Sequence, residues 1–273
     1  MRFIGQFQIQ YYQKEIVMTN KELQVKAKAF RKEIFKFKTT SKAGHLATCL
    51  STVDILTSLF YSDDTVFKRD RDKIIFSKGH GSPAIYPILA DLNYIDRKEL
   101  DKYCTPEGIL RMHADYSIPL CNFVGGSLGN GIGYAAGLAY KNDINIFVIL
   151  GDGELYEGSV WESLMFISHH KLNNIKLIID RNHLCILGNT EEMIQLESLE
   201  EKFRAFKFDV TSLDGHNYDH LNKSFSYMNT KPEIIIADTV KGKGVSYMEG
   251  EWRYHTIIPS DEKSIKQGLK ELS

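Results

Sequence analysis

Cysteine pairs and a strong net charge are both missing from this sequence. The four cysteines (Cys49, Cys104, Cys121 and Cys185) are scattered, and no two of them form a C-x-x-C pair. That pattern argues against structural zinc and against a disulfide framework, and it fits a reduced cytosol. The formal net charge is only −1, so bulk electrostatics give no reason to expect a nucleic-acid or membrane partner.

Long hydrophobic runs and targeting signals are missing as well. No apolar run approaches the length of a membrane span, and the first residues, MRFIGQFQIQYYQK, lack the apolar core of a signal peptide. We interpret residues 1–17 as an N-terminal extension and residues 18–273 as a single domain. We expect the protein to be soluble and cytoplasmic.

The sequence does contain alternating helical and strand-like segments. Five apolar residues near the start recur at steps of four and three, which indicates one face of a helix: Leu23, Ala27, Phe30, Ile34 and Phe37. The segment Ser51–Asp54 resembles a capping box and predicts the start of a helix that runs through Leu59 and Phe60. Further helices are expected at 157–170, 199–206 and 261–272.

Apolar runs between these helices predict the strands. The runs at 144–150 and 177–182 are typical of parallel strands, which are buried on both faces of a sheet. Shorter strands are expected at 73–76, 208–210 and 234–238. A chain of 273 residues with 43% hydrophobic residues can bury a large core. The predicted fold is α/β, with a parallel β-sheet flanked by helices.

The two longest runs end in residues that can bind a cation and a phosphate. Gly151-Asp152-Gly153 ends the first run and Asn182 ends the second. Parallel sheets bind ligands at the carboxyl ends of their strands, where a carboxylate and an amide oxygen suit Mg²⁺ shared with phosphate. An isolated GDG is more often a simple turn, but the second strand ending in Asn favours a site.

Four histidines fall in loops rather than in periodic segments: His45 in KAGHL, His80 in SKGHG, His113 in RMHAD and His255 in RYHTI. His80 lies between two glycines at a predicted strand end, where glycine implies the close approach of another group. The other five histidines are less suggestive, and no two histidines have the spacing of a zinc site.

Two glycine-rich segments leave alternatives open. Gly131 to Ala136 fits G-x-G-x-x-A, but the strand that a dinucleotide site requires does not precede it. We interpret it as a loop that leads into a closely packed helix. In TVKGKGVSYMEG, Lys241 and Lys243 alternate with glycines, which suits either an anion-binding loop or a solvated basic loop.

Together these motifs resemble the amino-terminal, diphosphate-binding domain of transketolase, from about Glu22 to Ser260. SKAGHLATCLSTVDIL and IIFSKGHGSPAIY resemble the two histidine loops of the family, and NFVGGSLGNGIGYAAGLA resembles its glycine segment. GDGELYEGSVWESLMFISHHKL with LIIDRN matches its metal and diphosphate site, while VKGKGVSYMEG with His255 is a looser match.

The resemblance implies a thiamine-diphosphate-binding fold that holds thiamine diphosphate and Mg²⁺. The metal ligands would be Asp152, Asn182 and the backbone carbonyl of Leu184. The implied cofactor-binding residues are His80, Gly126, Ser127, Leu128, Gly151, Asp152, Gly153, Glu154, Asn182 and His255. The implied catalytic residues are His45, His80, His113 and His255, because histidine exchanges protons near neutral pH.

The implied reaction is the transfer of a two-carbon ketol unit from a ketose or ketose phosphate to an aldehyde or aldose. Whole transketolases carry a pyrimidine-binding domain and a third domain that are not present in this sequence. The family's activating glutamate belongs to that pyrimidine domain, and Glu154 does not replace it. We therefore expect the amino-terminal subunit of a split enzyme, with a separate carboxy-terminal subunit as partner. A homodimeric core within a heterotetramer is expected from the helix that contains Glu157, Trp161 and Glu162.

Two alternatives remain at this point. One is a subunit of another thiamine-dependent enzyme, such as a 2-oxo acid decarboxylase or dehydrogenase, although the histidine loops favour a polyol substrate. The other is a non-catalytic subunit that retains the fold. Two departures from the family, Leu46–Cys49 after His45 and HTIIP around His255, predict an altered sugar channel.

Overall fold

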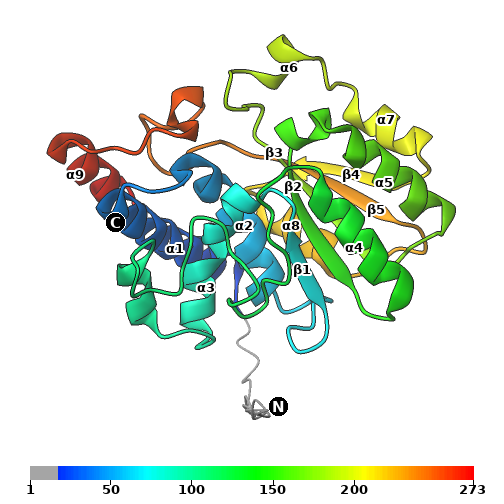
Figure 1. Cartoon of the computed structure of the whole chain (residues 1–273), viewed down its shortest axis with the longest axis horizontal. Coiled ribbons are helices and arrows are strands. Elements are labelled where there is room, and N and C mark those ends of the chain that lie inside the picture. Colours follow the sequence, from blue (N-terminus) through cyan, green and yellow to red (C-terminus); the bar gives the residue numbers. More distant parts are fainter. Residues whose placement is uncertain (1–17) are drawn as a thin grey trace.

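A five-stranded parallel sheet lies at the centre of the protein (Figure 1). Its strands are β1 (Lys73–Phe76), β2 (Ile146–Gly151), β3 (Ile175–Arg181), β4 (Asp209–Asp214) and β5 (Glu233–Asp238), in the order β1-β2-β3-β5-β4. All neighbouring strands are parallel. The structure is a computed structural model that describes residues 18–273, so the extension predicted at 1–17 lies outside the described residues.

Both faces of the sheet are buried, because successive strand residues point to opposite sides. In β2, Phe147 and Ile149 contribute to one core cluster, whereas Ile146, Val148 and Leu150 contribute to the other. The predicted α/β fold with a buried parallel sheet is therefore confirmed.

Two groups of helices cover these faces. The first face packs against α1 (Asn20–Ser41), α2 (Leu46–Tyr61), α3 (Tyr86–Asp91) and α8 (Tyr218–Phe225). The second packs against α4 (Asn130–Lys141), α5 (Gly158–His169) and α7 (Leu199–Ala205). Helix α9 (Glu262–Glu271) lies along α1, and α6 (Thr190–Met193) is a single turn. Short 3₁₀ helices are η1 (Gly79–Ile85), η2 (Arg97–Lys102), η3 (Gly153–Tyr156) and η4 (Trp252–His255).

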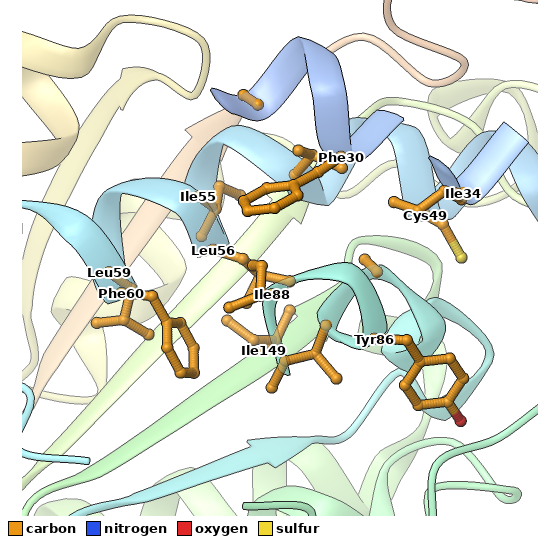
Figure 2. Packing of buried hydrophobic residues seen from close by; sticks show 14 of the residues in the cluster. Phe30, Ile34, Cys49, Ile55, Leu56, Leu59, Phe60, Tyr86, Ile88 and Ile149 are labelled. Carbon is orange, nitrogen blue, oxygen red and sulfur yellow. The ribbon is translucent and has the colours of Figure 1, made fainter. Parts of the chain in front are cut away.

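The first helix forms as its pattern predicts. Thr19 and Glu22 make a reciprocal capping box at its start, which satisfies backbone donors that the first turn leaves free. The five apolar residues of the predicted face are all buried, at 0–5% exposure. Figure 2 shows Phe30 of α1 next to Ile55 and Leu56 of α2, and Ile34 of α1 next to Cys49 of α2.

The predicted start of the second helix at Ser51 is wrong. Helix α2 begins at Leu46, directly after His45, and all of its residues are buried. Ser51 and Asp54 lie inside the helix, and both have distant partners instead of capping its start. Ser51 donates to Asp180 of β3, and Asp54 binds Arg31 of α1. In this buried helix, the pattern Ser51–Asp54 therefore marks hydrogen bonds to other elements of the fold and not a helix cap.

Residues 105–129 form a long irregular segment, with one isolated bridge between Cys121 and Ile74. Across residues 18–273, no helix has the length and apolar character needed to cross a membrane. The four cysteines are free thiols.

Candidate functional site

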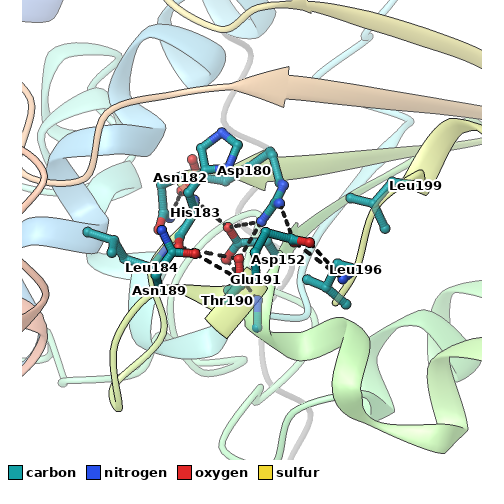
Figure 3. A network of polar contacts seen from close by, with 12 residues as sticks. Asp152, Asp180, Asn182, His183, Leu184, Asn189, Thr190, Glu191, Leu196 and Leu199 are labelled. Atoms are coloured by element: carbon teal, nitrogen blue, oxygen red, sulfur yellow. Dashed lines mark hydrogen bonds and ion pairs between the residues drawn. The ribbon is translucent and has the colours of Figure 1, made fainter. Parts of the chain in front are cut away.

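Asp152 and Asn182 lie side by side at the carboxyl edge of the sheet. Strands β2 and β3 run in register up to Gly151 and Asp180, so the residues that follow each strand emerge together. The Asp152 carboxylate accepts a hydrogen bond from the backbone N–H of His183 at 2.6 Å. Figure 3 shows Asp152 among Asn182, His183 and Leu184. The two residues predicted to share an edge therefore do so.

Three oxygens at this edge can hold a hard cation. They belong to the Asp152 carboxylate, the Asn182 side-chain amide and the Leu184 backbone carbonyl. The Asn182 oxygen accepts from the Leu184 N–H at 3.2 Å, which keeps the 182–184 turn compact. Among residues 18–273, no group of three or more His, Cys, Asp or Glu side chains could hold a metal. A cation here would use one carboxylate and two neutral oxygens, and Mg²⁺ bound in this way completes its shell with phosphates and water.

Arg181 holds Asp152 through a buried ion pair. Its guanidinium is buried and contacts Asp152 at 3.2 Å, Glu191 at 2.7 Å and Glu197 at 2.9 Å. Burial raises the pKa of Asp152, while the positive charge of Arg181 opposes that rise. Sequence reasoning missed Arg181, although it directly precedes Asn182.

Lys78 and Asp180 form a buried ion pair beneath the same edge. The Asp180 carboxylate also accepts from the hydroxyls of Ser51 and Thr239. Burial alone would raise the pKa of Asp180, but Lys78 and the hydroxyl donors hold it below its usual range. We call Lys78, Asp152, Asp180, Arg181 and Asn182 the strand-end group.

Glu154, which the resemblance places against the cofactor, is engaged by its own chain. Its buried carboxylate accepts from the Ser77 hydroxyl and from the backbone N–H groups of Gly129 and Gly151. Burial raises its pKa, and these donors oppose the rise. Glu154 thus joins three loops at the edge of the sheet.

The glycines around His80 allow two loops to touch. A Cβ on Gly79 would lie 2.1 Å from the carbonyl oxygen of Gly125, and one on Gly125 would lie 2.4 Å from the carbonyl oxygen of Phe76. The close approach expected at His80 is therefore that of the 125–129 segment. Beyond this contact, Gly126 and Ser127 are exposed and Leu128 is half-buried, and no atom lies within 4 Å of a Cβ built on Gly126.

The four loop histidines come together from four separate segments, and we call them the histidine group: His45, His80, His113 and His255. The ring of His45 lies 5.1 Å from that of His80, 5.2 Å from that of His255 and 6.3 Å from that of His113. The Nδ1 atom of His45 is buried without a hydrogen-bond partner among the described residues. Such an atom requires a partner, which a bound ligand would supply.

The histidine group is uncharged at neutral pH. Burial lowers the pKa of His45 to about 4 and that of His255 to about 3. Burial also lowers the pKa of His80 and that of His113. The buried ammonium of Lys38 lowers the pKa of His45 further. Neutral imidazoles can both donate and accept protons, which suits contacts with hydroxyl groups.

Lys241 connects the strand-end group with the histidine group. Its buried ammonium donates to the Leu184 carbonyl at 2.8 Å and lies 2.7 Å from Nδ1 of His255. Burial lowers its pKa to about 8. Lys241 forms no ion pair within residues 18–273, although the charges of Asp152 and Asp180 oppose the fall in its pKa. A buried cation without a paired anion favours an anionic ligand such as a diphosphate.

Comparisons with known proteins agree with this geometry. The family described as "Transketolase, thiamine diphosphate binding domain" matches residues 27–272. A subunit of the apulose-4-phosphate transketolase of Phocaeicola vulgatus is 34% identical over 264 residues, which are 92% of this chain and 94% of that relative. The 6-deoxy-6-sulfo-D-fructose transketolase subunit SqwG of a Clostridium species is 33% identical over 255 residues, 88% of this chain and 93% of that relative.

Among solved structures, the transketolase of Campylobacter jejuni superposes with a TM-score of 0.83 and 29% identity. The match covers 93% of this chain and 43% of that one. The chain therefore spans less than half of that solved transketolase, whereas it spans nearly all of the two relatives described as subunits.

Proposed function

This chain belongs to the transketolase family through its thiamine diphosphate binding domain, and from that premise we propose that it is the amino-terminal subunit of a split transketolase. With a separate carboxy-terminal subunit, it transfers a two-carbon ketol unit from a ketose to an aldehyde acceptor. Relatives of similar length that are named as transketolase subunits support the split. The four-histidine cluster next to the strand-end group is the single observation that carries the proposal.

The donor set supports thiamine diphosphate bound with Mg²⁺. Asp152, Asn182 and the Leu184 carbonyl would hold the metal, and Lys241 would contribute a positive charge to the diphosphate. The open space over Gly126 leaves room for the same group. When bound, the cofactor supplies the chemistry that breaks and forms the carbon–carbon bond.

The histidine group would bind the sugar and exchange protons with its hydroxyls. Since burial lowers the pKa of each ring, all four imidazoles are neutral at pH 7, with one nitrogen that donates and one that accepts. His45, with its unpartnered Nδ1 atom, is the strongest candidate for direct contact. General acid–base catalysis by such a residue typically contributes about 10²–10⁴-fold to a rate.

The substrate class follows from the relatives named above. One is named for apulose 4-phosphate and the other for 6-deoxy-6-sulfo-D-fructose, and both names describe a sugar with an anionic group at its end. We propose a ketose of that class as the donor, with its anionic end held mainly by the partner subunit.

The surface next to the metal-binding turn supports docking of a partner. Ile186, Leu187 and Ile194 are 51%, 70% and 67% exposed, and they border Leu184 in the 184–194 segment. Apolar side chains gathered beside a binding site are typical of an interaction surface.

A second surface supports self-association. Trp161, expected to contribute to a subunit contact, stacks on Phe203 of its own chain and donates to the Leu155 carbonyl. The exposed large apolar residues of α4 and α5 are instead Tyr134, Tyr140, Met165 and Phe166. We propose this face for the homodimer contact of a heterotetramer. We also propose residues 18–273 as one domain and the cytoplasm as its location, which the four free thiols support.

The test is a titration of thiamine diphosphate and Mg²⁺ into the purified chain, alone and with its partner subunit, followed by calorimetry and a ketol-transfer assay. We expect metal-dependent binding and activity only with the partner. Full ketol transfer by the chain alone would contradict the split enzyme. No binding under either condition would leave the non-catalytic subunit, and decarboxylation of 2-oxo acids without ketol transfer would favour the other thiamine enzymes.

A further inference from the structure

The turn after β4 is pressed against the end of β5. Gly215 donates its N–H to the Asp238 carbonyl at 2.7 Å. A Cβ at this position would lie 2.5 Å from Cγ2 of Thr239 and 2.9 Å from the Asp238 carbonyl oxygen. Only glycine fits in this gap, and the contact brings the next residue, His216, under the backbone that follows β5.

The imidazole ring of His216 makes two hydrogen bonds, which together determine its tautomer. Its Nε2 atom lies 2.9 Å from the backbone nitrogen of Val240, and its Nδ1 atom lies 2.6 Å from Oδ2 of Asp54. A backbone N–H can only donate, so Nε2 carries the lone pair that accepts. The proton of the ring is therefore on Nδ1 and is donated to the carboxylate.

The Asp54 carboxylate that holds this ring is itself held in place by other side chains. The carboxylate is buried and also accepts from the Arg31 guanidinium and from the Tyr218 hydroxyl at 2.8 Å. Arg31 in turn donates to the Leu50 carbonyl at 3.1 Å. These residues belong to α1, α2 and α8, so the hydrogen bonds of Asp54 connect three helices on one face of the sheet.

Val240 directly precedes Lys241, whose ammonium lies at the junction of the strand-end group and the histidine group. Other bonds hold the same loop. The Thr239 hydroxyl donates to Asp180, and the Thr239 N–H donates to the Arg181 carbonyl at 3.0 Å. Gly242 donates its N–H to the Ala47 carbonyl at 3.0 Å, and the Lys241 carbonyl accepts from Gly250 at 3.1 Å. Among these bonds, the one from Val240 ends on the ring of His216 and holds the residue that directly precedes Lys241.

We propose that His216 is a positioning residue for diphosphate binding: through Val240 it fixes the loop that places Lys241 between the Leu184 carbonyl and His255. The inference rests on the proposed function, because Lys241 is assigned there to the diphosphate. It assigns a role to a histidine that the sequence alone gave no reason to select. Removing a residue that orients a metal ligand through a hydrogen bond typically costs about 10–100-fold in affinity, and we take that range as the scale for His216.

Two substitutions separate the two bonds of His216. In H216N the short amide reaches the position of Nδ1, so it keeps the bond to Asp54 and loses the acceptor for Val240. In H216Q the longer amide reaches the position of Nε2, so it keeps the acceptor for Val240 and loses the donor to Asp54. The matched control is H220Q, at an exposed histidine of α8.

The readouts are the Kd for thiamine diphosphate with Mg²⁺ in the presence of the partner subunit, the Tm, and the hydrogen-exchange rate of the Val240 amide. In H216N we expect a Kd on the order of tenfold weaker, faster exchange at Val240 and a Tm close to that of the wild type. In H216Q we expect a Kd close to that of the wild type and a lower Tm.

Two outcomes would overturn the inference and leave the proposed function standing. One is a loss of affinity that parallels the loss in Tm in both variants, and the other is an unchanged Kd in H216N. A wild-type protein that binds no thiamine diphosphate would overturn both. In that case, exchange at Val240 would still show whether His216 holds the loop.

Discussion

In the strand-end group, each charged side chain has a counter-charge: Lys78 is paired with Asp180, and Arg181 with Asp152. In the histidine group, the rings contact one another, and Nδ1 of His45 has no partner among the described residues. The first region is organised before any ligand arrives, as a site for a fixed cofactor requires. The second leaves hydrogen-bonding capacity unused, as a site for an exchanging substrate requires.

The largest expected effect comes from breaking the ion pair of the strand-end group with K78M. This change leaves the buried Asp180 carboxylate without its cation, and such a loss costs about 3–5 kcal/mol in the free energy of unfolding. Chemical denaturation measures the loss, and calorimetry measures the accompanying loss of affinity for thiamine diphosphate.

The matched control is K176M. Lys176 also forms a buried ion pair, with Glu233 at 3.0 Å, but at the opposite, amino-terminal ends of β3 and β5. K176M should lose similar stability and retain cofactor affinity at temperatures where it is folded. Equal losses of cofactor affinity in K78M and K176M would show that binding depends on overall stability and not on where in the sheet the ion pair lies.

A smaller effect is expected from D152N, which removes the charge but keeps the shape of the side chain. Without the carboxylate, the affinity for thiamine diphosphate with Mg²⁺ should fall at least about a hundredfold, or ~2.7 kcal/mol. D238N is the control, because the Asp238 carboxylate lies at the carboxyl end of β5 but is 66% exposed and contacts only the ring of His183, at 3.3 Å, among the described side chains. A D152N protein that retains the affinity of D238N would argue against a metal at Asp152.

The smallest effect is expected from H45Q, which tests the histidine group through pH. The pKa of His45 is about 4 in the folded protein, below its ordinary value of 6.5. Between these values the unfolded chain binds a proton that the folded chain does not, so His45 destabilises the wild type as the pH falls from 7 to 5.

H45Q should therefore gain in Tm relative to the wild type over that pH interval, by about 2–4 °C or less. Solvent screening around a partly exposed ring keeps the effect small. The comparison with the wild type also cancels the opposite effects of Asp152 and Glu154, whose pKa values burial raises. A difference in Tm that stays constant with pH would show that His45 is not buried in its neutral form.

Two members of the strand-end group could be predicted, because their signal is local. Asp152 and Asn182 each follow an apolar run, and the carboxyl ends of parallel strands always share one edge. That the four loop histidines meet in one group follows only from the family resemblance, since they are far apart in the chain and no rule of spacing joins them.

The partners of buried charges could not be predicted. Asp180 is 102 residues from Lys78 and 129 from Ser51, and Glu154 is 77 residues from Ser77. Sequence patterns describe neighbours along one helix or strand, whereas these pairs depend on which faces of different elements meet. For the same reason the cap predicted at Ser51–Asp54 is wrong, and nothing in the sequence distinguishes His216 from an ordinary turn residue.

The parallel order of the strands also affects how the protein reaches this structure. Lys73 pairs with Ile146, and Lys176 with Glu233, so a long crossover segment separates the two strands of each of these pairs. Each pairing closes a long loop, whose entropy opposes folding until the contacts have formed. The binding edge draws on the ends of β2, β3 and β5, and it exists only after the most distant of these closures. A nascent chain that stops before β5 has Asp152 and Asn182 but lacks Lys241.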